Sequence, residues 1–457
     1  MRASGEIRTV AVLDVGKTNV KLVLVDVAEG REVWSRSMGN SVRQDGPYPH
    51  ADVEAIAAFL NDGLAAVARD IDALSITTHG ATGALLRGDG LALPVLDYEH
   101  AGPDALAEAY DRVRPGFAET FSPRLRGGLN LGAQLFWQAH AFPQVFAIAD
   151  AFVTYPQYWA WRLTGVAATE ATSLGCHTDL WAPGRDRVSS LVETQGWTGH
   201  LAPLRSAFDR IGPLRPELAA RLGLRPGLPV ACGIHDSNAS LLPHLQRGSA
   251  PATIVSSGTW VISFAIGGSL DSLDPCRDTL ANVDAYRRPV PSARFMGGRE
   301  FDLLTGGAPV EPDAATVGMV IARCIMALPT FVAGCGSFPD RVGGWSVDPA
   351  PLTAPERTAV ASLYAALMTA AGLNLIGATG ATVIEGPLAA NRLYGEALLA
   401  LTGRPVAVAG GGTGTSIGAA SLVAPVATPH PSPVVPRFGL GEAFAAYTAR
   451  WRASVAH

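Results

Sequence analysis

Residues 10–26 read VAVLDVGKTNVKLVLVD, and this stretch decides the fold. It predicts a buried strand that ends near Val15, a turn over residues 16–19 and a second apolar strand over residues 20–25. Asp14 interrupts the first strand, and a carboxylate in a buried strand is costly unless another charge offsets it. The turn beside it exposes backbone N–H groups and hydroxyls, which suit a phosphate. We therefore expect a phosphate site here, with a metal cation between the phosphate and the carboxylate.

The use of lysine supports this interpretation. The chain has 35 Lys and Arg residues, and the only two lysines, Lys17 and Lys21, both lie in this stretch. Lysine presents a compact charge that is suited to phosphate. The alternative is an ordinary β-hairpin with a surface turn and incidental lysines. The motifs that follow later in the chain favour the phosphate site.

Length and composition limit the class of protein. The 457 residues are enough for two or three domains, and the 48% hydrophobic content indicates a globular protein with a large core. The net charge of −5 argues against a nucleic-acid partner. The five cysteines form no CxxC pair, which favours a reducing, cytoplasmic compartment without a disulfide framework. We expect no signal peptide and no segment apolar enough to span a membrane.

Strands and helices alternate along the chain, as in an α/β fold. A strand is predicted over residues 31–38, an amphipathic helix over 52–69, and a strand over 73–78 that ends in His79-Gly80. Residues 101–220 read mainly as helices and loops, with Trp159, Trp161 and Trp181 as core residues. The other expected strands cover residues 85–93 (a strand pair), 94–98, 228–233, 381–385 and 405–409. The other expected helices cover residues 133–141, 156–163, 216–222, 237–245, 314–326, 355–376, 391–401, 415–423 and 442–454.

A second hairpin follows about 240 residues after the first. Residues 252–264, ATIVSSGTWVISF, again have an apolar strand, a small polar turn and another apolar strand. Such internal similarity suggests two related α/β domains that face each other. We place the boundary so that residues 1–246 form the first domain and residues 247–457 the second.

Asp236 lies where an α/β sheet binds its ligand. The strand over residues 228–233 ends in His235-Asp236, directly before a helix, and ligands of such sheets bind at the carboxyl ends of strands. A carboxylate there could accept a hydroxyl proton during phosphoryl transfer. The alternative is a helix N-cap, at which Asp is common. His235 by itself would be structural.

Five motifs in order resemble the FGGY carbohydrate kinase family of the actin-like ATPase superfamily. They are DVGKTNVK at 14–21, SITTHG at 75–80, GIHDSNA at 233–239, SSGT at 256–259, and the segment 384–420 with TGRPV at 402–406 and SIGAA at 416–420. The first motif is most similar to that of the L-fuculokinase and rhamnulokinase branches. Glu385-Gly386-Pro387 departs from the usual family form, which has two or three glycines there, and this departure concerns the adenine contacts.

The resemblance implies two actin-like (ribonuclease H-like) domains that flank a central catalytic cleft, with sugar on the first domain and nucleotide on the second. It implies that Asp236 is the general base and that Asp14 holds Mg²⁺. His79 could instead be a packed core residue, and Asp97 competes with Glu99 for a sugar role. The implied ATP- and phosphate-binding residues are Gly16, Lys17, Thr18, Asn19, Ser257, Gly258, Thr259, Gly386 and Asn391. The implied sugar-binding residues are His79, Gly80, Glu99, His235 and Asp236.

The implied function is ATP- and Mg²⁺-dependent phosphorylation of a small sugar at a primary hydroxyl, with a ketose such as L-fuculose or L-rhamnulose favoured. Xylulose, ribulose, glycerol and erythritol remain alternative acceptors. A nucleotide-binding sensor on a kinase fold is the alternative from another class, but it would need the loss of the catalytic carboxylate. A dinucleotide-binding oxidoreductase fits worse, because a hairpin follows the first strand in place of GxGxxG and a helix. A homodimer is a base-rate expectation only.

Overall fold

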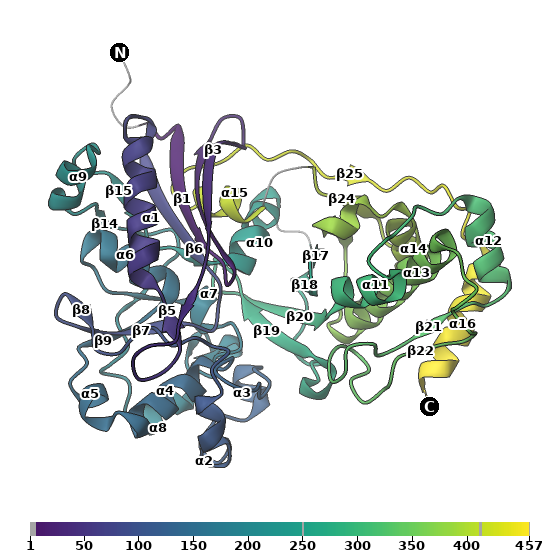
Figure 1. Cartoon of the computed structure of the whole chain (residues 1–457), viewed down its shortest axis with the longest axis horizontal. Coiled ribbons are helices and arrows are strands. Elements are labelled where there is room, and N and C mark those ends of the chain that lie inside the picture. Colours follow the sequence, from purple (N-terminus) through teal and green to yellow (C-terminus); the bar gives the residue numbers. More distant parts are fainter. Residues whose placement is uncertain (1–5, 249–250, 411–413, 457) are drawn as a thin grey trace. The chain divides into compact units, whose positions relative to one another are not determined.

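The chain divides into two compact units in the computed structural model, which describes residues 6–248, 251–410 and 414–456 (Figure 1). Unit 1 comprises Met1–Ser249, Ala281–Pro289 and Gly412–Thr428. Unit 2 comprises Ala250–Leu280, Val290–Gly411 and Pro429–His457. The chain therefore enters each unit more than once, and the domain boundary at residue 246 stays a prediction.

Unit 1 is built on a mixed sheet that contains the first hairpin. Its strands lie in the order β14-β15-β6-β1-β2-β3, and β16 also pairs with β6. The antiparallel register of β1 and β2 runs from Thr9↔Asp26 to Val15↔Val20, as the apolar runs predict. Both β1 and β16 pair with β6 in parallel, so their carboxyl ends meet at one edge of the sheet. The strand bounds are Thr9–Val15 (β1), Asn19–Asp26 (β2), Arg31–Gly39 (β3), Ala73–Thr78 (β6), Arg210–Pro213 (β14), Pro229–Ala231 (β15) and Ile234–His235 (β16).

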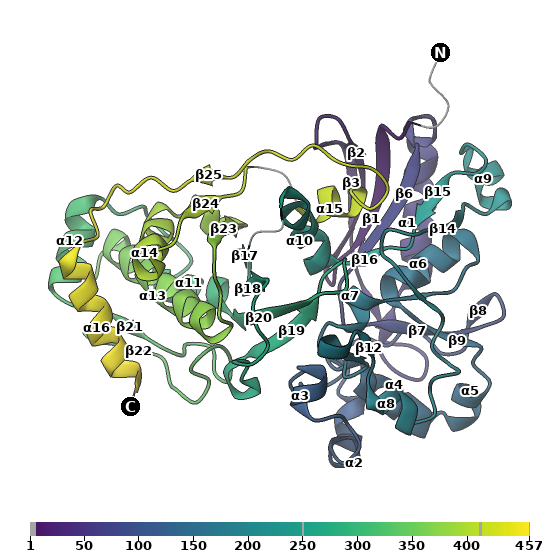
Figure 2. The ribbon, with the colours of Figure 1, turned by 180° about the vertical axis from the view of Figure 1, so that it is seen from behind.

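Helices cover both faces of this sheet. On one face, α1 and α6 pack on side chains such as Leu13 and Leu22. On the other face α15 packs on β1 and β6, and α10 lies beside α15 (Figure 2). The two helices approach closely because Gly418 lacks a side chain: a Cβ there would lie 1.7 Å from the carbonyl oxygen of Ala239. The bounds are Val53–Ala66 (α1), Tyr155–Thr164 (α6), Pro216–Leu222 (α9), Asp236–Arg247 (α10) and Gly414–Ala420 (α15).

The middle of unit 1 is mainly helices and loops, as expected, around a second core. The three predicted core tryptophans, Trp159, Trp161 and Trp181, are all buried. The helices here are Ala107–Asp111 (α2), Phe117–Thr120 (α3), Leu131–Ala141 (α4), Pro143–Ala147 (α5), Ala171–Leu174 (α7) and Ser190–Thr194 (α8). The longer strands are Gly83–Arg87 (β7) and Ala151–Thr154 (β9), and Gly90–Leu91 (β8) pairs with β7.

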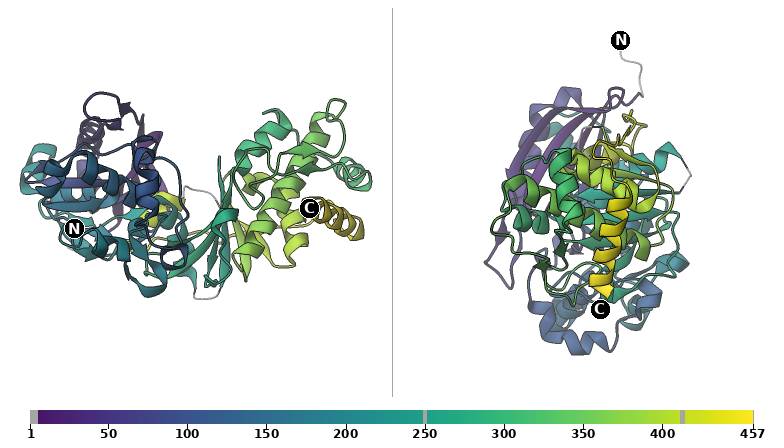
Figure 3. Two further views of the ribbon diagram at one scale, coloured as in Figure 1. Left: turned by 90° about the horizontal axis from the view of Figure 1, so that it is seen from below. Right: turned by 90° about the vertical axis from the view of Figure 1, so that its right-hand side faces the viewer.

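Unit 2 is built on another seven-stranded sheet, which contains the second hairpin and has the order β19-β20-β18-β17-β23-β24-β25. The strand bounds are Ala252–Ser257 (β17), Val261–Ile266 (β18), Thr279–Val283 (β19), Pro289–Phe295 (β20), Ala381–Glu385 (β23), Val406–Val408 (β24) and Ser432–Pro433 (β25). Its helices are Gly297–Thr305 (α11), Ala314–Ala322 (α12), Ala354–Leu375 (α13), Arg392–Thr402 (α14) and Glu442–Ala456 (α16). Within unit 2, α16 packs beside α12 at the edge of the helical layer (Figure 3).

Helix α13 corrects the expectation that no segment could span a membrane. By length and composition this 22-residue helix is apolar enough, although 83% of its most apolar window is buried inside the protein. It begins with a capping box, in which the Thr353 N–H donates to Glu356 Oε2 at 2.7 Å, and it supplies much of the unit 2 core. Such burial is what the core helix of a globular domain shows.

Some predicted elements are wrong. Residues 94–98 form only an isolated bridge between His50 and Leu96, in which Val95 O accepts the Ala51 N–H and the Asp97 N–H donates to Pro49 O. The helix expected over residues 314–326 ends at Ala322, since Cys324 adopts a left-handed conformation with φ of 51°. The sequence analysis also missed β19, β20 and α11. All five cysteines are free thiols in the structure.

Candidate active site

The turn after β1 is held closed by its own backbone and by Asn40. The Gly16 N–H donates to Asn19 O at 2.9 Å. Asn40 donates its N–H to Thr18 O at 2.8 Å and its Nδ2 to Gly16 O at 2.8 Å. Thr18 and Asn19 are exposed, so their side chains can reach a ligand. Sequence reasoning missed Asn40, because nothing in a stretch 24 residues away marks it as a partner of the turn.

Lys17 extends from this turn toward a cluster at residues 97–99. Its ammonium forms ion pairs with Asp97 and with Glu99 Oε2, the latter at 3.3 Å. It also lies 4.6 Å from the centroid of the Tyr98 ring. The structure therefore joins the lysine expected at phosphate to the glutamate expected at sugar. A phosphate role for Lys17 stays a prediction, and it would require the ammonium to exchange these partners for the ligand.

Asp14 lies in β1 opposite Lys21 of β2 and Thr77 of β6. Burial, followed by repulsion from Asp236, raises the pKa of Asp14 from 3.8 to about 7, although Lys21 acts in the opposite direction. The ionised carboxylate is therefore poorly compensated in the protein alone. A bound divalent cation would supply the missing positive charge.

His79 is packed between aromatic rings. The backbone N–H of His79 donates to Val15 O at 2.9 Å, and its ring Nδ1 lies 2.9 Å from Gly80 O. The ring centroid lies 5.3 Å from that of Tyr98 and 5.2 Å from that of Tyr155. Burial lowers the pKa of His79, so the ring is neutral near pH 7. This environment matches the core-residue alternative, and sugar contact by His79 stays a prediction.

Asp236 and His235 follow each other at the end of β16 and the start of α10. Asp236 Oδ1 accepts hydrogen bonds from the Ser237 N–H at 2.6 Å and the Ser237 hydroxyl at 3.2 Å. His235 Nε2 lies 3.2 Å from the same oxygen, and His235 Nδ1 lies 3.2 Å from Asn238 Nδ2. The carboxylate of Asp236 is 32% exposed, whereas the His235 side chain is 6% exposed. Asp236 is therefore the member of this pair that a substrate can reach.

A buried carboxylate anchors the backbone of His235. Glu170 accepts hydrogen bonds from the Thr172 N–H at 2.9 Å and the Thr172 hydroxyl at 2.5 Å. The Thr172 hydroxyl oxygen in turn accepts the His235 N–H at 3.1 Å. Burial raises the pKa of Glu170 to about 7. Glu170 and Thr172, neither of which the sequence analysis identified, fix the main chain next to Asp236.

Gly80 and Cys176 lie against the His235 ring. A Cβ on Gly80 would lie 2.7 Å from His235 Nε2 and 3.6 Å from Cys176 Sγ. Because Gly80 has no side chain, the His235 imidazole can lie against its main chain. The sugar contact expected of Gly80 stays a prediction. Burial would raise the pKa of Cys176, but the neighbouring His177 and His235 lower it to about 5.

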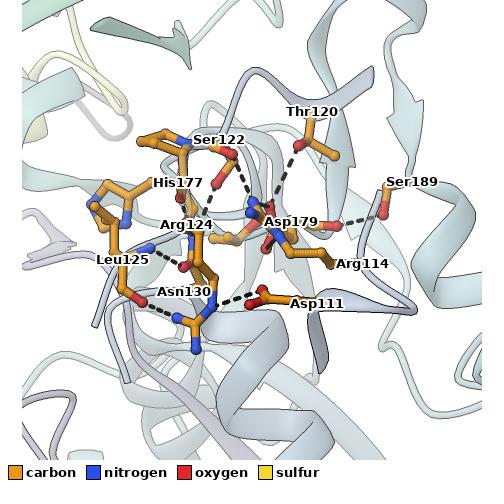
Figure 4. A network of polar contacts seen from close by, with 12 residues as sticks. Asp111, Arg114, Thr120, Ser122, Arg124, Leu125, Asn130, His177, Asp179 and Ser189 are labelled. Atoms are coloured by element: carbon orange, nitrogen blue, oxygen red, sulfur yellow. Dashed lines mark hydrogen bonds and ion pairs between the residues drawn. The ribbon is translucent and has the colours of Figure 1, made fainter. Parts of the chain in front are cut away.

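A polar network holds the loop next to His177 (Figure 4). Asp179 is fully buried and accepts Arg114 Nε at 3.0 Å, Arg114 Nη2 at 2.8 Å and the Tyr110 hydroxyl at 2.7 Å. Asn130 donates to His177 O at 2.9 Å and accepts the Leu125 N–H at 2.7 Å. Because these groups satisfy one another, the network is structural support rather than a binding site.

Unit 2 contains a cavity of about 650 Å³ that is lined by the turn of the second hairpin and by the start of α14. This volume is in the range of sites for nucleotide-sized ligands. Two glycines allow other main-chain segments to approach the second hairpin here. A Cβ would lie 1.9 Å from Gly258 O at position 298 and 1.9 Å from Ser257 O at position 386. The lining residues include the predicted Ser257, Gly258, Thr259 and Asn391, together with Arg299, Phe301, Pro387 and Phe438.

Two of the predicted nucleotide residues have structural hydrogen bonds. The Ser257 hydroxyl donates to Glu385 O at 2.5 Å and accepts the Leu388 N–H at 3.0 Å. Asn391 caps α14 by accepting the Tyr394 N–H at 3.0 Å, and its Nδ2 donates to Ser362 Oγ at 2.8 Å. Their side chains shape the cavity wall, so direct ligand contacts from these two residues stay a prediction.

Comparisons with known proteins identify the family. Residues 122–243 match the N-terminal domain of the FGGY family of carbohydrate kinases, and residues 249–431 match the C-terminal domain of carbohydrate kinase FGGY. A solved carbohydrate kinase from Novosphingobium aromaticivorans is 36% identical, with a TM-score of 0.92 and 99% of each chain covered. The chain belongs to the FGGY family of carbohydrate kinases. The family resemblance and the two-domain actin-like fold predicted from the sequence are thereby confirmed.

Further FGGY relatives are more distant. An L-fuculokinase of Salmonella typhi is 27% identical over 274 residues, which are 58% of this chain and 57% of that protein. The match thus spans a little more than half the length of the curated relative. A xylulose kinase from Lactobacillus acidophilus is 15% identical, with a TM-score of 0.76 and 98% of each chain covered, and this likeness shows the fold alone.

Proposed function

We propose that this protein is an ATP-dependent kinase that phosphorylates a primary hydroxyl of a small ketose, with L-fuculose as the first candidate. The observation that carries the proposal is the pair of carboxylates, Asp14 and Asp236, at one edge of the unit 1 sheet. Asp14 lies opposite Thr77, and Asp236 follows His235, which lies opposite Thr78 of the same strand. Family membership connects this pair to sugar phosphorylation.

Asp236 is proposed as the general base. Phosphoryl transfer needs an oriented hydroxyl and an acceptor for its proton, and it needs little other covalent chemistry from the protein. The partly exposed carboxylate of Asp236 can accept a hydrogen bond from the sugar hydroxyl. As the hydroxyl oxygen bonds to the γ-phosphorus, its proton passes to Asp236 and the bond to ADP breaks. Asp236 is the first residue of α10 rather than its N-cap, since His235 holds the N-cap position without a side-chain cap hydrogen bond.

The residues present fit Mg²⁺ and ATP. The described residues contain no group of three or more His, Cys, Asp or Glu side chains that could hold a metal ion. This agrees with magnesium, which often uses one or two carboxylates, waters and substrate phosphates rather than a cage of side chains. Asp14 would hold the ion, which supplies neutralisation of phosphate charge when it is bound. The unit 2 cavity would accommodate adenosine, and the turn at residues 257–259 in its wall would contact phosphate. In unit 1, the turn at residues 16–19 is a separate phosphate candidate.

The choice of L-fuculose rests on the curated relatives, which are named L-fuculokinases and are 26–27% identical. At this identity the pocket contacts that decide specificity can differ, since a few hydrogen bonds to hydroxyls control it. L-Rhamnulose, xylulose, ribulose, glycerol and erythritol are therefore part of the test rather than further proposals.

The test is a coupled ADP-release assay with Mg-ATP across these sugars and the corresponding aldoses. The proposal expects kcat/KM on L-fuculose to exceed that on every other acceptor by at least ~10-fold, with no turnover in EDTA. Preferred turnover of a different ketose would correct the substrate alone. Binding of ATP without turnover of any acceptor would contradict the kinase assignment.

A further inference from the structure

We infer that Phe438 is the platform on which the base of ATP stacks, and that Glu396 is the positioning residue that holds Phe438 in place. The inference rests on the proposed function, because it deepens the nucleotide site of unit 2. It concerns a segment that follows the part of the chain with a family match, since the match to the C-terminal domain of carbohydrate kinase FGGY ends at residue 431. The sequence motifs do not extend to this segment either.

The first step is the path of the segment that carries Phe438. It begins with β25, which pairs antiparallel with β24 at the edge of the unit 2 sheet. The Val434 N–H then donates to Val406 O at 2.9 Å. Val434 also lies against α14, where a Cβ on Gly395 would come within 3.1 Å of Val434 Cγ2. The segment is thus fixed to the sheet and to α14 before it reaches the cavity.

The second step is the set of hydrogen bonds that Glu396 of α14 accepts from the residues that follow. Glu396 Oε2 accepts the Arg437 N–H at 2.5 Å and the Phe438 N–H at 2.8 Å. Its Oε1 accepts the Leu440 N–H at 3.3 Å. Glu396 is only 3% exposed, and a buried carboxylate is costly unless hydrogen bonds offset its desolvation. Here main-chain N–H groups of one segment do so, and hydrogen bonds to a charged acceptor are the stronger kind.

The third step is the place of Phe438 in the wall of the nucleotide cavity. Phe438 is half-buried: it packs against the unit 2 core, and it also lines the cavity of about 650 Å³. The same wall contains the turn of the second hairpin, Asn391 at the start of α14, and Phe301 of α11. An aromatic side chain with exposed surface in a cavity of this size is suited to stack on a base. The hydrogen bonds of Glu396 fix the main chain of Phe438 relative to α14, which supplies part of the same wall.

Nucleotide binding by two variants of Phe438 tests the platform. F438A should raise the Kd for ATP and for ADP by ~5- to 100-fold in calorimetry of the full chain without sugar, the range for loss of one base–aromatic contact. F438W should keep both Kd values within about threefold, because an indole also stacks on a base. The Kd for the preferred ketose should stay within about twofold in both variants. V435A is the matched control, since Val435 lies in the same segment and is 72% exposed.

A double-mutant cycle tests the role of Glu396. E396Q should raise the Kd for ATP by ~3- to 10-fold, because the main chain at Phe438 loses hydrogen bonds to a charged acceptor. The double variant E396Q/F438A should bind ATP as F438A does, within about twofold, since Glu396 acts through Phe438. Losses that simply add in the double variant would overturn the positioning role of Glu396.

A fluorescence measurement places the base beside residue 438 without a change at Glu396. Binding of ATP should quench the added tryptophan of F438W, whereas the added tryptophan of V435W should not respond. Equal responses in these two variants would overturn the inference, and so would a Kd for ATP in F438A within about twofold of the wild type. Failure of the wild-type chain to bind ATP would contradict the proposed function itself, so the two failures are distinguishable.

Discussion

Replacement of Asp14 by Asn is expected to stabilise unit 1 at neutral pH while it removes activity. The partly buried carboxylate of Asp14 lies in a strand, and desolvation together with Asp236 raises its pKa from 3.8 to about 7. The folded protein therefore opposes ionisation of this group in the absence of metal. Asn keeps the shape of the side chain and has no charge, so it removes that cost but cannot hold Mg²⁺ in the same way.

The sign and size of the expected change in stability follow from the pKa of Asp14 in the unfolded chain, 3.8, and in the folded chain, about 7. A carboxyl with a raised folded pKa contributes stability that is fully present below its unfolded pKa, near 4, and is lost as the pH rises through 7. The stability lost over the whole pH range is about 4 kcal/mol, since a difference of one between the folded and unfolded pKa values corresponds to about 1.4 kcal/mol. Between pH 5 and pH 8 the loss is about 2–3 kcal/mol. The stability of D14N relative to the wild type should rise by that amount over this interval.

The assay is urea unfolding of the metal-free full chain in EDTA at pH 5, 6.5 and 8, followed by tryptophan fluorescence. D62N, an exposed substitution on α1, is the control and should show no such trend. ADP release by D14N with Mg-ATP should be lower by at least ~100-fold. If D14N is less stable than the wild type at pH 8, or if the difference does not change with pH, the reasoning about this carboxylate is refuted.

Three further substitutions test the packing around the sites. Gly80→Ala should lower kcat by ~10-fold with unchanged ATP binding, because its Cβ would lie 2.7 Å from His235 Nε2 and displace the ring next to Asp236. A variant with the wild-type kcat and pH–rate profile would contradict this prediction. Asp179→Asn should cost ~3–5 kcal/mol in urea unfolding, since it leaves the largely buried Arg114 cation without its partner. Gly298→Ala should weaken ATP binding by at least ~10-fold in calorimetry while sugar affinity is retained, because its Cβ would lie 1.9 Å from a backbone oxygen in the unit 2 cavity.

The sequence predicts those features that depend on local pattern. Residues 10–26 have two apolar runs on either side of a short polar turn, which is typical of a hairpin, and β1 and β2 lie within one residue of the expected bounds. The order of elements alone predicts Asp236 at a strand end before a helix, and α10 begins at that residue. The helix over residues 52–69 was marked by its cap, and Asp52 does accept the Ala55 N–H.

The sequence does not predict partners that are far apart in the chain. Lys17 pairs with Asp97 and Glu99, which lie 80 and 82 residues away, and the ring of His235 meets Gly80 and Cys176 from other elements. Local pattern also cannot tell whether a polar side chain is free: Asn391 reads as a ligand contact but caps α14. Such uses depend on three-dimensional packing, which neither spacing nor periodicity encodes.

The central claim is that Asp236 accepts the proton of the sugar hydroxyl, and single-turnover kinetics of D236N test it most directly. The full-length variant is mixed with Mg-ATP and the preferred ketose, and sugar phosphate is followed by rapid quench. The account predicts wild-type Kd values for ATP and sugar, within about threefold, and a chemical step slower by at least ~10²-fold, as for loss of a general base. A chemical step at the wild-type rate in D236N would contradict the account.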